Sequence, residues 1–150
     1  MTSCEAISTL EQFVDALRIR VAVFIQEQGF PPGWEPDEID KVAKHYVARL
    51  ENVTVATARA HSTEGGSLKI ERMAVLKPYR NMHIGTHLTQ HVVADIQQAN
   101  GHKIWLNAQT HAASFYERVG FRVISEQHYP CGTRVPHVAM EYDGGPVGRA

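Results

Sequence analysis

The stretch 70-IERMAVLKPYRNMHIGTHLTQHVV-93 decides the fold, because its hydrophobic period changes within a few residues. Residues 68–75 read as a strand, residues 79–87 as a tight turn, and residues 86–100 as a helix that stops at Gly101. The apolar stripe of this helix is Ile84, Leu88, Val92, Ile96 and Ala99. A strand, a tight turn and a helix start together predict a fold that can hold an anion at the turn.

Two residues of the turn support that interpretation. Arg80 could pair with a phosphate oxygen, and Gly85 would let the backbone approach a ligand closely or adopt a positive φ. The helix dipole adds to the attraction for an anion. From spacing alone, a plain connecting turn remains the alternative.

The flanking sequence predicts a sheet covered by helices. Residues 9–25 predict an amphipathic helix capped by Thr9, and residues 45–50 and 53–60 predict a strand pair joined at Glu51 and Asn52. A strand at 104–108, a helix at 111–119 and strands at 121–127 and 135–142 follow. The expected stripe of the first helix is Leu10, Phe13, Val14, Leu17, Val21 and Phe24. This order favours an α+β or α/β protein with one domain over residues 1–150 and a frayed tail at 143–150.

Composition excludes several classes of protein. With 15 basic and 16 acidic side chains, nothing in the totals favours a nucleic-acid or membrane partner. No apolar run approaches the roughly 20 residues that span a bilayer, and the N-terminal residues lack a signal pattern, so we expect a cytoplasmic protein. Cys4 and Cys131 are far apart and outside any CxxC spacing, which favours reduced thiols.

Two motifs resemble those of a known superfamily. The stretch 70–93 resembles motif A of the GNAT superfamily of acyl-CoA N-acyltransferases, with Arg80 and Gly85 in the pyrophosphate turn. His83 stands where the superfamily usually has its first glycine, which places a side chain beside the phosphates. The stretch 109-QTHAASFYERVGF-121 resembles motif B, with Gln109 at the usual asparagine position. The segments 23-VFIQEQGF-30 and 136-PHVAM-140 resemble the ElaA/YjcF-like branch.

The resemblance implies a fold, a co-substrate and an acceptor. It implies a three-layer fold with a mixed, mostly antiparallel sheet of about seven strands and about four helices. It also implies acetyl-CoA as co-substrate, a small-molecule or peptide amine as acceptor, and compatibility with a homodimer. We expect no metal. The residues implied in cofactor binding are Met73, Ala74, Val75, Arg80, Asn81, Met82, His83, Ile84, Gly85, Thr86, Gln109, Ala112, Phe115 and Tyr116.

The resemblance also implies direct attack of the amine in a ternary complex. Tyr116 is expected to protonate the leaving thiolate, although without the family pattern it reads as a core partner of Phe115. The general base stays open between Glu27, Glu71, His111, His137 and a water, and we favour Glu27 and His137. A cationic amine would also be attracted to the acidic group of Glu35, Asp37, Glu38 and Asp40, unless these side chains only face solvent.

Three rival hypotheses remain from the sequence. His83, His87 and His91 are spaced by four and could hold a metal on one helix face, although a solvated histidine face is the better interpretation. Cys131 could form an acetyl-cysteine intermediate, which direct transfer does not require. A non-catalytic acyl-CoA-binding module is the third, suggested by His83 in place of glycine and by the open choice of base.

Overall fold

The computed structural model describes residues 1–99, 103–130 and 133–145. Within these ranges seven strands form one mixed sheet in the order β1-β2-β3-β4-β5-β7-β6. Only the β4–β5 pair is parallel among the strand pairs of the described residues. The predicted mixed, mostly antiparallel sheet is therefore confirmed. The strands are β1 (Thr2–Ala6), β2 (Lys44–Leu50), β3 (Val53–Ser62), β4 (Leu68–Val75), β5 (Ile104–Gln109), β6 (Phe121–Val123) and β7 (His137–Tyr142).

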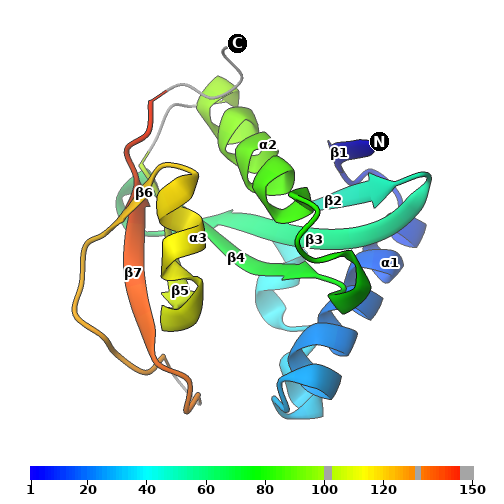
Figure 1. Cartoon of the computed structure of the whole chain (residues 1–150), viewed down its shortest axis with the longest axis horizontal. Coiled ribbons are helices and arrows are strands. Elements are labelled where there is room, and N and C mark those ends of the chain that lie inside the picture. Colours follow the sequence, from blue (N-terminus) through cyan, green and yellow to red (C-terminus); the bar gives the residue numbers. More distant parts are fainter. Residues whose placement is uncertain (100–102, 131–132, 146–150) are drawn as a thin grey trace.

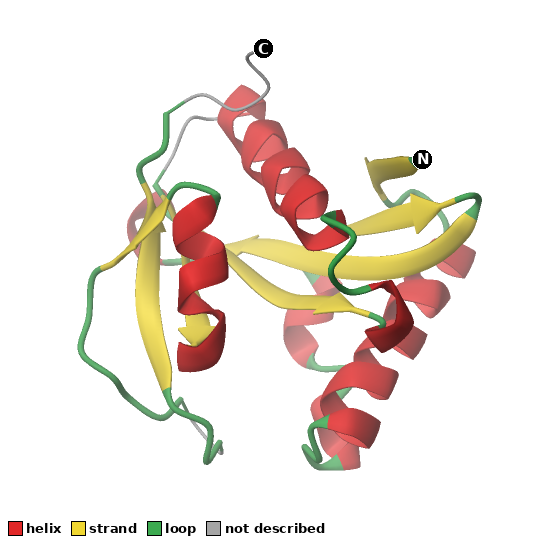
Figure 2. Ribbon diagram, in the orientation of Figure 1, coloured by secondary structure: helices red, strands yellow, loops and turns green. Residues whose placement is uncertain are grey.

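Helices cover both faces of the sheet (Figures 1 and 2). The α-helices are α1 (Leu10–Arg20), α2 (Ile84–Ala99) and α3 (Ala113–Arg118), and α1 continues as the π-helix η1 (Val21–Glu27). Short 3-10 segments are η2 (Pro32–Trp34), η3 (Glu38–Lys41), η4 (Glu64–Gly66), η5 (Lys77–Tyr79) and η6 (Thr110–Ala112). In Figure 1, α2 and α3 lie on the near face of the sheet and α1 lies behind it. This arrangement gives the three layers that the resemblance implies.

Each face has its own apolar core. The larger core lies under α2 and α3 and includes Leu88, Val92 and Met140, which are fully buried. The smaller core lies under α1 and η1 and includes Ile19, Val23 and Phe24. Burial of these side chains favours the folded state by roughly 25 cal/mol per Å² of apolar surface removed from water.

The sheet opens between its two central strands. β4 and β5 pair only at Leu68↔Ile104 and Lys69↔Trp105, so their C-terminal parts separate. On the other side of β4 the register with β3 shifts between Thr57 and Arg59, and Arg72 has a φ of 54°. Such a bulge sets two residues against one and bends the strand. The β5-facing backbone of β4 is therefore left without a strand partner after Lys69, and a cleft opens there.

The first helix is present, but its predicted buried face is only partly right: Phe24 is buried and Phe13, Leu17 and Val21 are half-buried. Thr9 caps it with a capping box, as expected. However, Leu10 is 76% exposed and Val14 is 37% exposed, whereas Ile19 and the charged Arg20 are buried. Arg20 is held in the buried face by the carboxylates of Glu35 and Asp40.

Other element predictions hold with adjusted ends. The stripe of α2 is buried from Ile84 to Ile96, but Ala99 at its end is exposed. The predicted strands 121–127 and 135–142 shorten to β6 and β7, and β1 was not predicted. Of the expected frayed tail, residues 143–145 are described and make hydrogen bonds, for example from Asp143 N to Gly120 O at 3.0 Å. Residues 146–150 lie outside the described ranges.

Candidate active site

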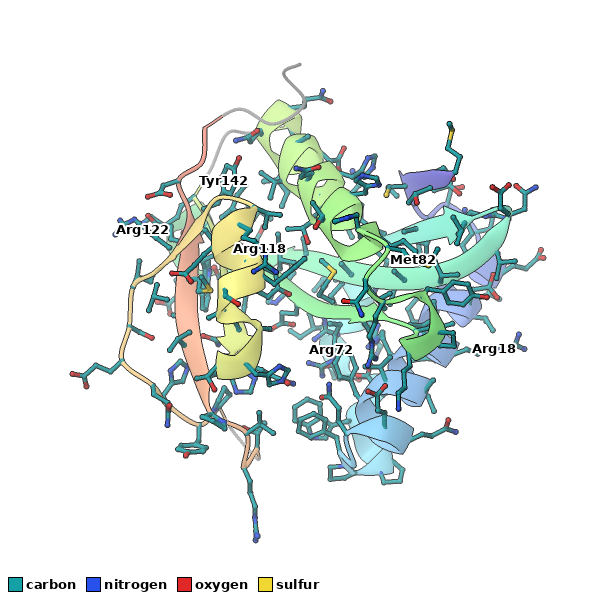
Figure 3. The ribbon with its side chains drawn as sticks, in the orientation of Figure 1. Arg18, Arg72, Met82, Arg118, Arg122 and Tyr142 are labelled. Atoms are coloured by element: carbon teal, nitrogen blue, oxygen red, sulfur yellow. The ribbon has the colours of Figure 1, made fainter. Side chains whose placement is uncertain are left out.

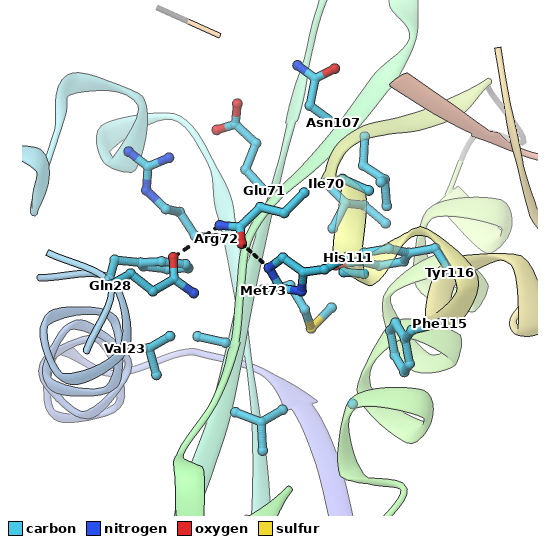
Figure 4. A pocket seen from close by; sticks show the side chains of 18 of the residues that line it. Val23, Gln28, Ile70, Glu71, Arg72, Met73, Asn107, His111, Phe115 and Tyr116 are labelled. Carbon is cyan, nitrogen blue, oxygen red and sulfur yellow. Dashed lines mark hydrogen bonds between the residues drawn. The ribbon is translucent and has the colours of Figure 1, made fainter. Parts of the chain in front are cut away.

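The gap between β4 and β5 is the mouth of a cleft of about 890 Å³. Its floor is the unpaired part of β4, one wall is η1 and η2, and the other is β5, α3 and His137. Figure 4 shows Val23 and Gln28 on the η1 side and His111, Phe115 and Tyr116 on the opposite side. Every predicted catalytic or cofactor-binding residue lines this cleft except Met82, which is 46% exposed.

The turn before α2 follows the predicted strand–turn–helix arrangement. Asn81 and His83 have φ values of 66° and 60°, and His83 O accepts the bond from His87 N at 3.0 Å. α2 therefore begins directly after His83, and the N–H groups of its first turn have no intrahelical acceptor. Gly85 has no positive φ; instead, a Cβ there would lie 3.3 Å from Phe115 Cζ. The absence of a side chain at Gly85 thus allows close packing of α2 against α3.

Arg80 is held by groups of the protein itself. Its Nε donates to Val75 O at 2.9 Å, and its two terminal nitrogens donate to the Glu27 carboxylate at 2.6 and 2.8 Å. Hydrogen bonds from Arg80 lower the pKa of Glu27 below its usual value. Glu27 is therefore an ionised partner of the motif arginine in the free protein, and this weakens its capacity as a base.

Tyr116 combines a core position with access to the cleft. Its ring makes edge contacts with Phe115 and Phe121 at 5.0 and 5.8 Å between centroids. Burial raises the pKa of Tyr116 well above its usual value, so the phenol keeps its proton at neutral pH. The packing role and the position at the cleft exist together.

The other candidate bases differ in their surroundings. Burial opposes ionisation of Glu71, yet Lys69 and Arg59 bind it and lower its pKa to about 2. His111 is exposed and its Nε2 lies 2.6 Å from Gln109 Oε1, so this nitrogen donates. His137 Nδ1 donates to Val135 O at 2.7 Å, which fixes the tautomer and leaves Nε2 with a lone pair.

The pKa of His137 is lowered. Burial is the largest cause and outweighs the hydrogen bond to Val135 O, which raises this pKa; nearby His128, His111 and Lys69 lower it further. His137 is therefore neutral at pH 7 and can accept a proton. It combines an unprotonated form with an Nε2 that has no hydrogen bond to the described residues, whereas Glu27 and Glu71 are bound by cations.

The similarity of this chain to known proteins agrees with the geometry of the cleft. Residues 15–143 match the family model described as an acetyltransferase (GNAT) domain. The chain belongs to the GNAT acetyltransferase family.

Similar proteins cover most of the chain. YjcF of Bacillus subtilis (strain 168), named as an uncharacterized N-acetyltransferase, is 32% identical over 89% of this chain and 94% of its own length. The crystal structure of Escherichia coli ElaA matches with a TM-score of 0.84 and 24% identity, covering 95% of this chain and 100% of ElaA. Arabidopsis thaliana Naa50, solved with the bisubstrate analogue CoA-Ac-MVNAL, matches with a TM-score of 0.69 and 21% identity over 95% of this chain and 98% of its own.

GNAT enzymes use acyl-CoA, and the cleft fits such a co-substrate. The unpaired backbone of β4 can pair with the amide groups of an extended ligand, and the first turn of α2 offers N–H donors to a pyrophosphate. Arg118 of α3 lines the cleft and lies on the same face of the molecule as Met82 of the turn (Figure 3). Within the described ranges, no group of three or more His, Cys, Asp or Glu residues could hold a metal ion.

Some earlier expectations find no counterpart in this site. His83 precedes α2 in a left-handed conformation, so His83, His87 and His91 do not share one continuous helix face. Cys131 lies outside the described residues. No helix of the described residues is long and apolar enough to cross a membrane.

Sequence reasoning missed a polar bridge in the GNAT cleft. Gln109 Nε2 donates to Gln28 Oε1 at 3.0 Å, and Gln109 Oε1 accepts from His111. The dashed lines in Figure 4 mark this bridge between η1 and the β5 side. Two adjacent residues of the η1 side thus reach different parts of the cleft: Glu27 binds Arg80 of the turn, and Gln28 binds Gln109 at the end of β5. The adjacent Glu27 and Gln28 after an apolar helix were visible in the sequence, but their partners are 53 and 81 residues away.

The acidic group at 35–40 has a structural role that the sequence did not indicate. The buried Glu35 binds Arg20, and Asp40 binds Arg20 at 2.8 Å and Arg59 at 2.8 Å. Asp37 binds Arg59 at 2.6 Å, whereas Glu38 is exposed and pairs with Lys41. Three of the four acids are therefore neutralised by arginines, and the expected attraction of a cationic amine to them has no support.

Proposed function

We propose that this GNAT acetyltransferase transfers an acetyl group from acetyl-CoA to a primary amine by direct attack in a ternary complex. Tyr116 acts as the general acid and His137 as the general base. The observation that carries the proposal is that a protonated phenol and a neutral imidazole with a free Nε2 line the same cleft as the unpaired edge of β4.

The chemistry requires three contributions from the protein. The walls of the cleft hold the two reactants together, which removes much of the entropic barrier. Nε2 of His137 takes a proton from the amine, while Nδ1–H stays bonded to Val135 O and keeps the ring in place. The Tyr116 hydroxyl donates its proton to the departing thiolate of CoA. Backbone N–H groups of the separated part of β4 can polarise the thioester carbonyl.

Glu27 and His137 are both candidate bases from the sequence, and their contacts in the structure support His137. Glu27 is engaged by both terminal nitrogens of Arg80, whereas Nε2 of His137 has no hydrogen bond to the described residues. Glu27 then governs access of an anion to Arg80 instead of taking a proton.

The test is turnover and binding of two variants. Tyr116→Phe should lower kcat by about 100-fold or more, while calorimetric titration shows unchanged affinity for acetyl-CoA. His137→Gln should lower kcat/KM and abolish its fall at acidic pH. Because the pKa of His137 is lowered, the base is active above this pKa, and the wild-type rate should fall only below about pH 6.5.

Matched controls exist in the chain. Tyr142→Phe removes a hydroxyl that binds Gly145 O, and His87→Gln changes an exposed residue of α2. Both should retain wild-type turnover. Equal loss of turnover and acetyl-CoA binding in Tyr116→Phe would assign this residue to cofactor binding and argue against the proposal.

A further inference from the structure

The acceptor side of the cleft is the part away from the motif residues that are expected to hold acetyl-CoA. We define it by Phe30 and Trp34 of the η1–η2 wall, Lys69 and Glu71 of β4, and His137 of β7. Phe30 stacks on Trp34 at 4.3 Å between ring centroids, and the Arg72 guanidinium lies over the Trp34 ring at 4.7 Å from its centroid. This wall therefore presents aromatic side chains to a ligand.

The negative charges of the carboxylates in the cleft are balanced by cations of the protein itself. Glu27 and Glu71 are the acidic side chains among the described residues that line it. Arg80 binds Glu27, and Glu71 accepts from Arg59 at 2.6 Å and lies 2.8 Å from Lys69 Nζ. Neither has a free charge to offer to an incoming cation.

The acids behind the wall are also compensated. Arg72, which lines the cleft, donates to Glu35 at 2.9 Å and to Asp37 at 3.1 Å. The cluster formed by Arg20, Glu35, Asp37, Asp40, Arg59, Lys69, Glu71 and Arg72 holds four positive and four negative side chains. It presents no net negative charge to the acceptor.

A cation, Lys69, lines the acceptor side near the proposed base, and it disfavours the protonated form of His137. An ammonium group held near this site would experience the same repulsion. In addition, it would lose water without gaining a carboxylate partner, which is unfavourable in a half-buried cleft.

We propose that the acceptor is a monoamine with an apolar body, and that the acceptor side excludes a second ammonium group. This inference rests on the proposed function, because it concerns the amine that His137 deprotonates. Polyamines and amino sugars with several ammonium groups are thereby excluded as preferred acceptors.

The test compares two amines that differ at one end of the chain, where one of them carries a second ammonium group. Pentylamine and cadaverine have the same five-carbon chain, and cadaverine carries one more ammonium group. Their binding is measured by calorimetry at pH 8 to the protein saturated with an unreactive thioether analogue of acetyl-CoA. We expect pentylamine to bind at least about 10-fold more tightly. Equal or tighter binding of cadaverine, or binding of neither amine, would overturn the inference.

A charge variant separates electrostatics from shape. Gln28→Glu adds a carboxylate at the mouth of the cleft, next to Gln109, with almost unchanged size. It should reduce the preference for pentylamine several-fold, whereas Gln28→Leu, which only removes the hydrogen bond to Gln109, should retain it. An unchanged preference in Gln28→Glu would show that charge does not set the selectivity.

The binding assay does not depend on catalysis. Turnover with acetyl-CoA is measured in parallel with both amines. Selective binding of pentylamine without turnover would contradict the proposed function but support the selectivity. Turnover of cadaverine at least equal to that of pentylamine would support the proposed function but contradict the selectivity.

Discussion

His83 has a backbone conformation that glycine adopts easily and other residues adopt rarely, with φ of 60°. The left-handed region costs an L-residue roughly 1–2 kcal/mol, partly offset for glycine by its larger unfolded-state entropy. We therefore predict that His83→Gly raises the free energy of unfolding by up to about 1 kcal/mol and leaves acetyl-CoA binding equal or tighter. Urea denaturation and calorimetry measure the two effects. His83→Ala keeps the strain and should not gain stability; weaker binding in His83→Gly would instead show that the imidazole contacts the phosphates.

Glu27 competes with an incoming phosphate for Arg80. An exposed ion pair of this kind contributes up to about 1 kcal/mol, which corresponds to about 5-fold in affinity. We expect Glu27→Gln to bind acetyl-CoA up to about 5-fold more tightly with kcat retained, as measured by calorimetry and steady-state kinetics. Glu11→Gln, an exposed change on α1, is the control. A large fall in kcat with unchanged binding would restore Glu27 as the base.

At the scale of elements, two glycines of the motifs have different functions. A Cβ on Gly120 would lie 2.7 Å from Tyr142 Cε1, and its φ is 107°, so Gly120→Ala combines strain with overpacking. We expect it to cost roughly 2–4 kcal/mol of unfolding free energy. Gly85→Ala only presses on the Phe115 ring and should cost about 1 kcal/mol, but it should weaken acetyl-CoA binding because it moves α3 relative to the turn. Thermal unfolding and calorimetry distinguish the two; the opposite ranking of stability would refute the packing argument.

Most elements were predictable because their periods are local. The strand 68–75 and the buried stripe of α2 follow from residue spacing alone, and the motifs placed nearly all predicted site residues in one cleft. The burial of Arg20 on α1 was not predictable, since it depends on the carboxylates of Glu35 and Asp40 later in the chain. The same limit applies to the site: the Gln28–Gln109 bridge and the Glu27–Arg80 pair join residues far apart in the chain.

At the scale of the whole molecule, the charge cluster joins α1, the segment 35–40, β3 and β4. The pKa of Glu71 falls from 4.5 to about 2 in the folded protein, so its contribution to stability is present above pH 4.5 and is lost as the pH falls toward 2. Each unit corresponds to about 1.4 kcal/mol, which gives an upper value of about 3 kcal/mol. Glu71→Gln should therefore destabilise the protein by up to this amount at pH 7 and by clearly less at pH 3, as measured by urea denaturation. Glu38→Gln, at an exposed pair, should change stability by less than about 0.5 kcal/mol at either pH. A pH-independent effect of Glu71→Gln would contradict the linkage.

The short β4–β5 pairing limits how far mutations can stabilise this protein without loss of activity. A sheet normally has unpaired backbone only at its two outer edges, whereas this one also has an edge in its interior. Further pairs between β4 and β5 would add hydrogen bonds and bring the two halves of the molecule into firmer contact, but they would also seal the opening in which the reactants meet. Mutations that extend the pairing of β4 with β5 should therefore raise the free energy of unfolding and lower the catalytic activity. For these two strands, greater stability and greater activity require opposite changes.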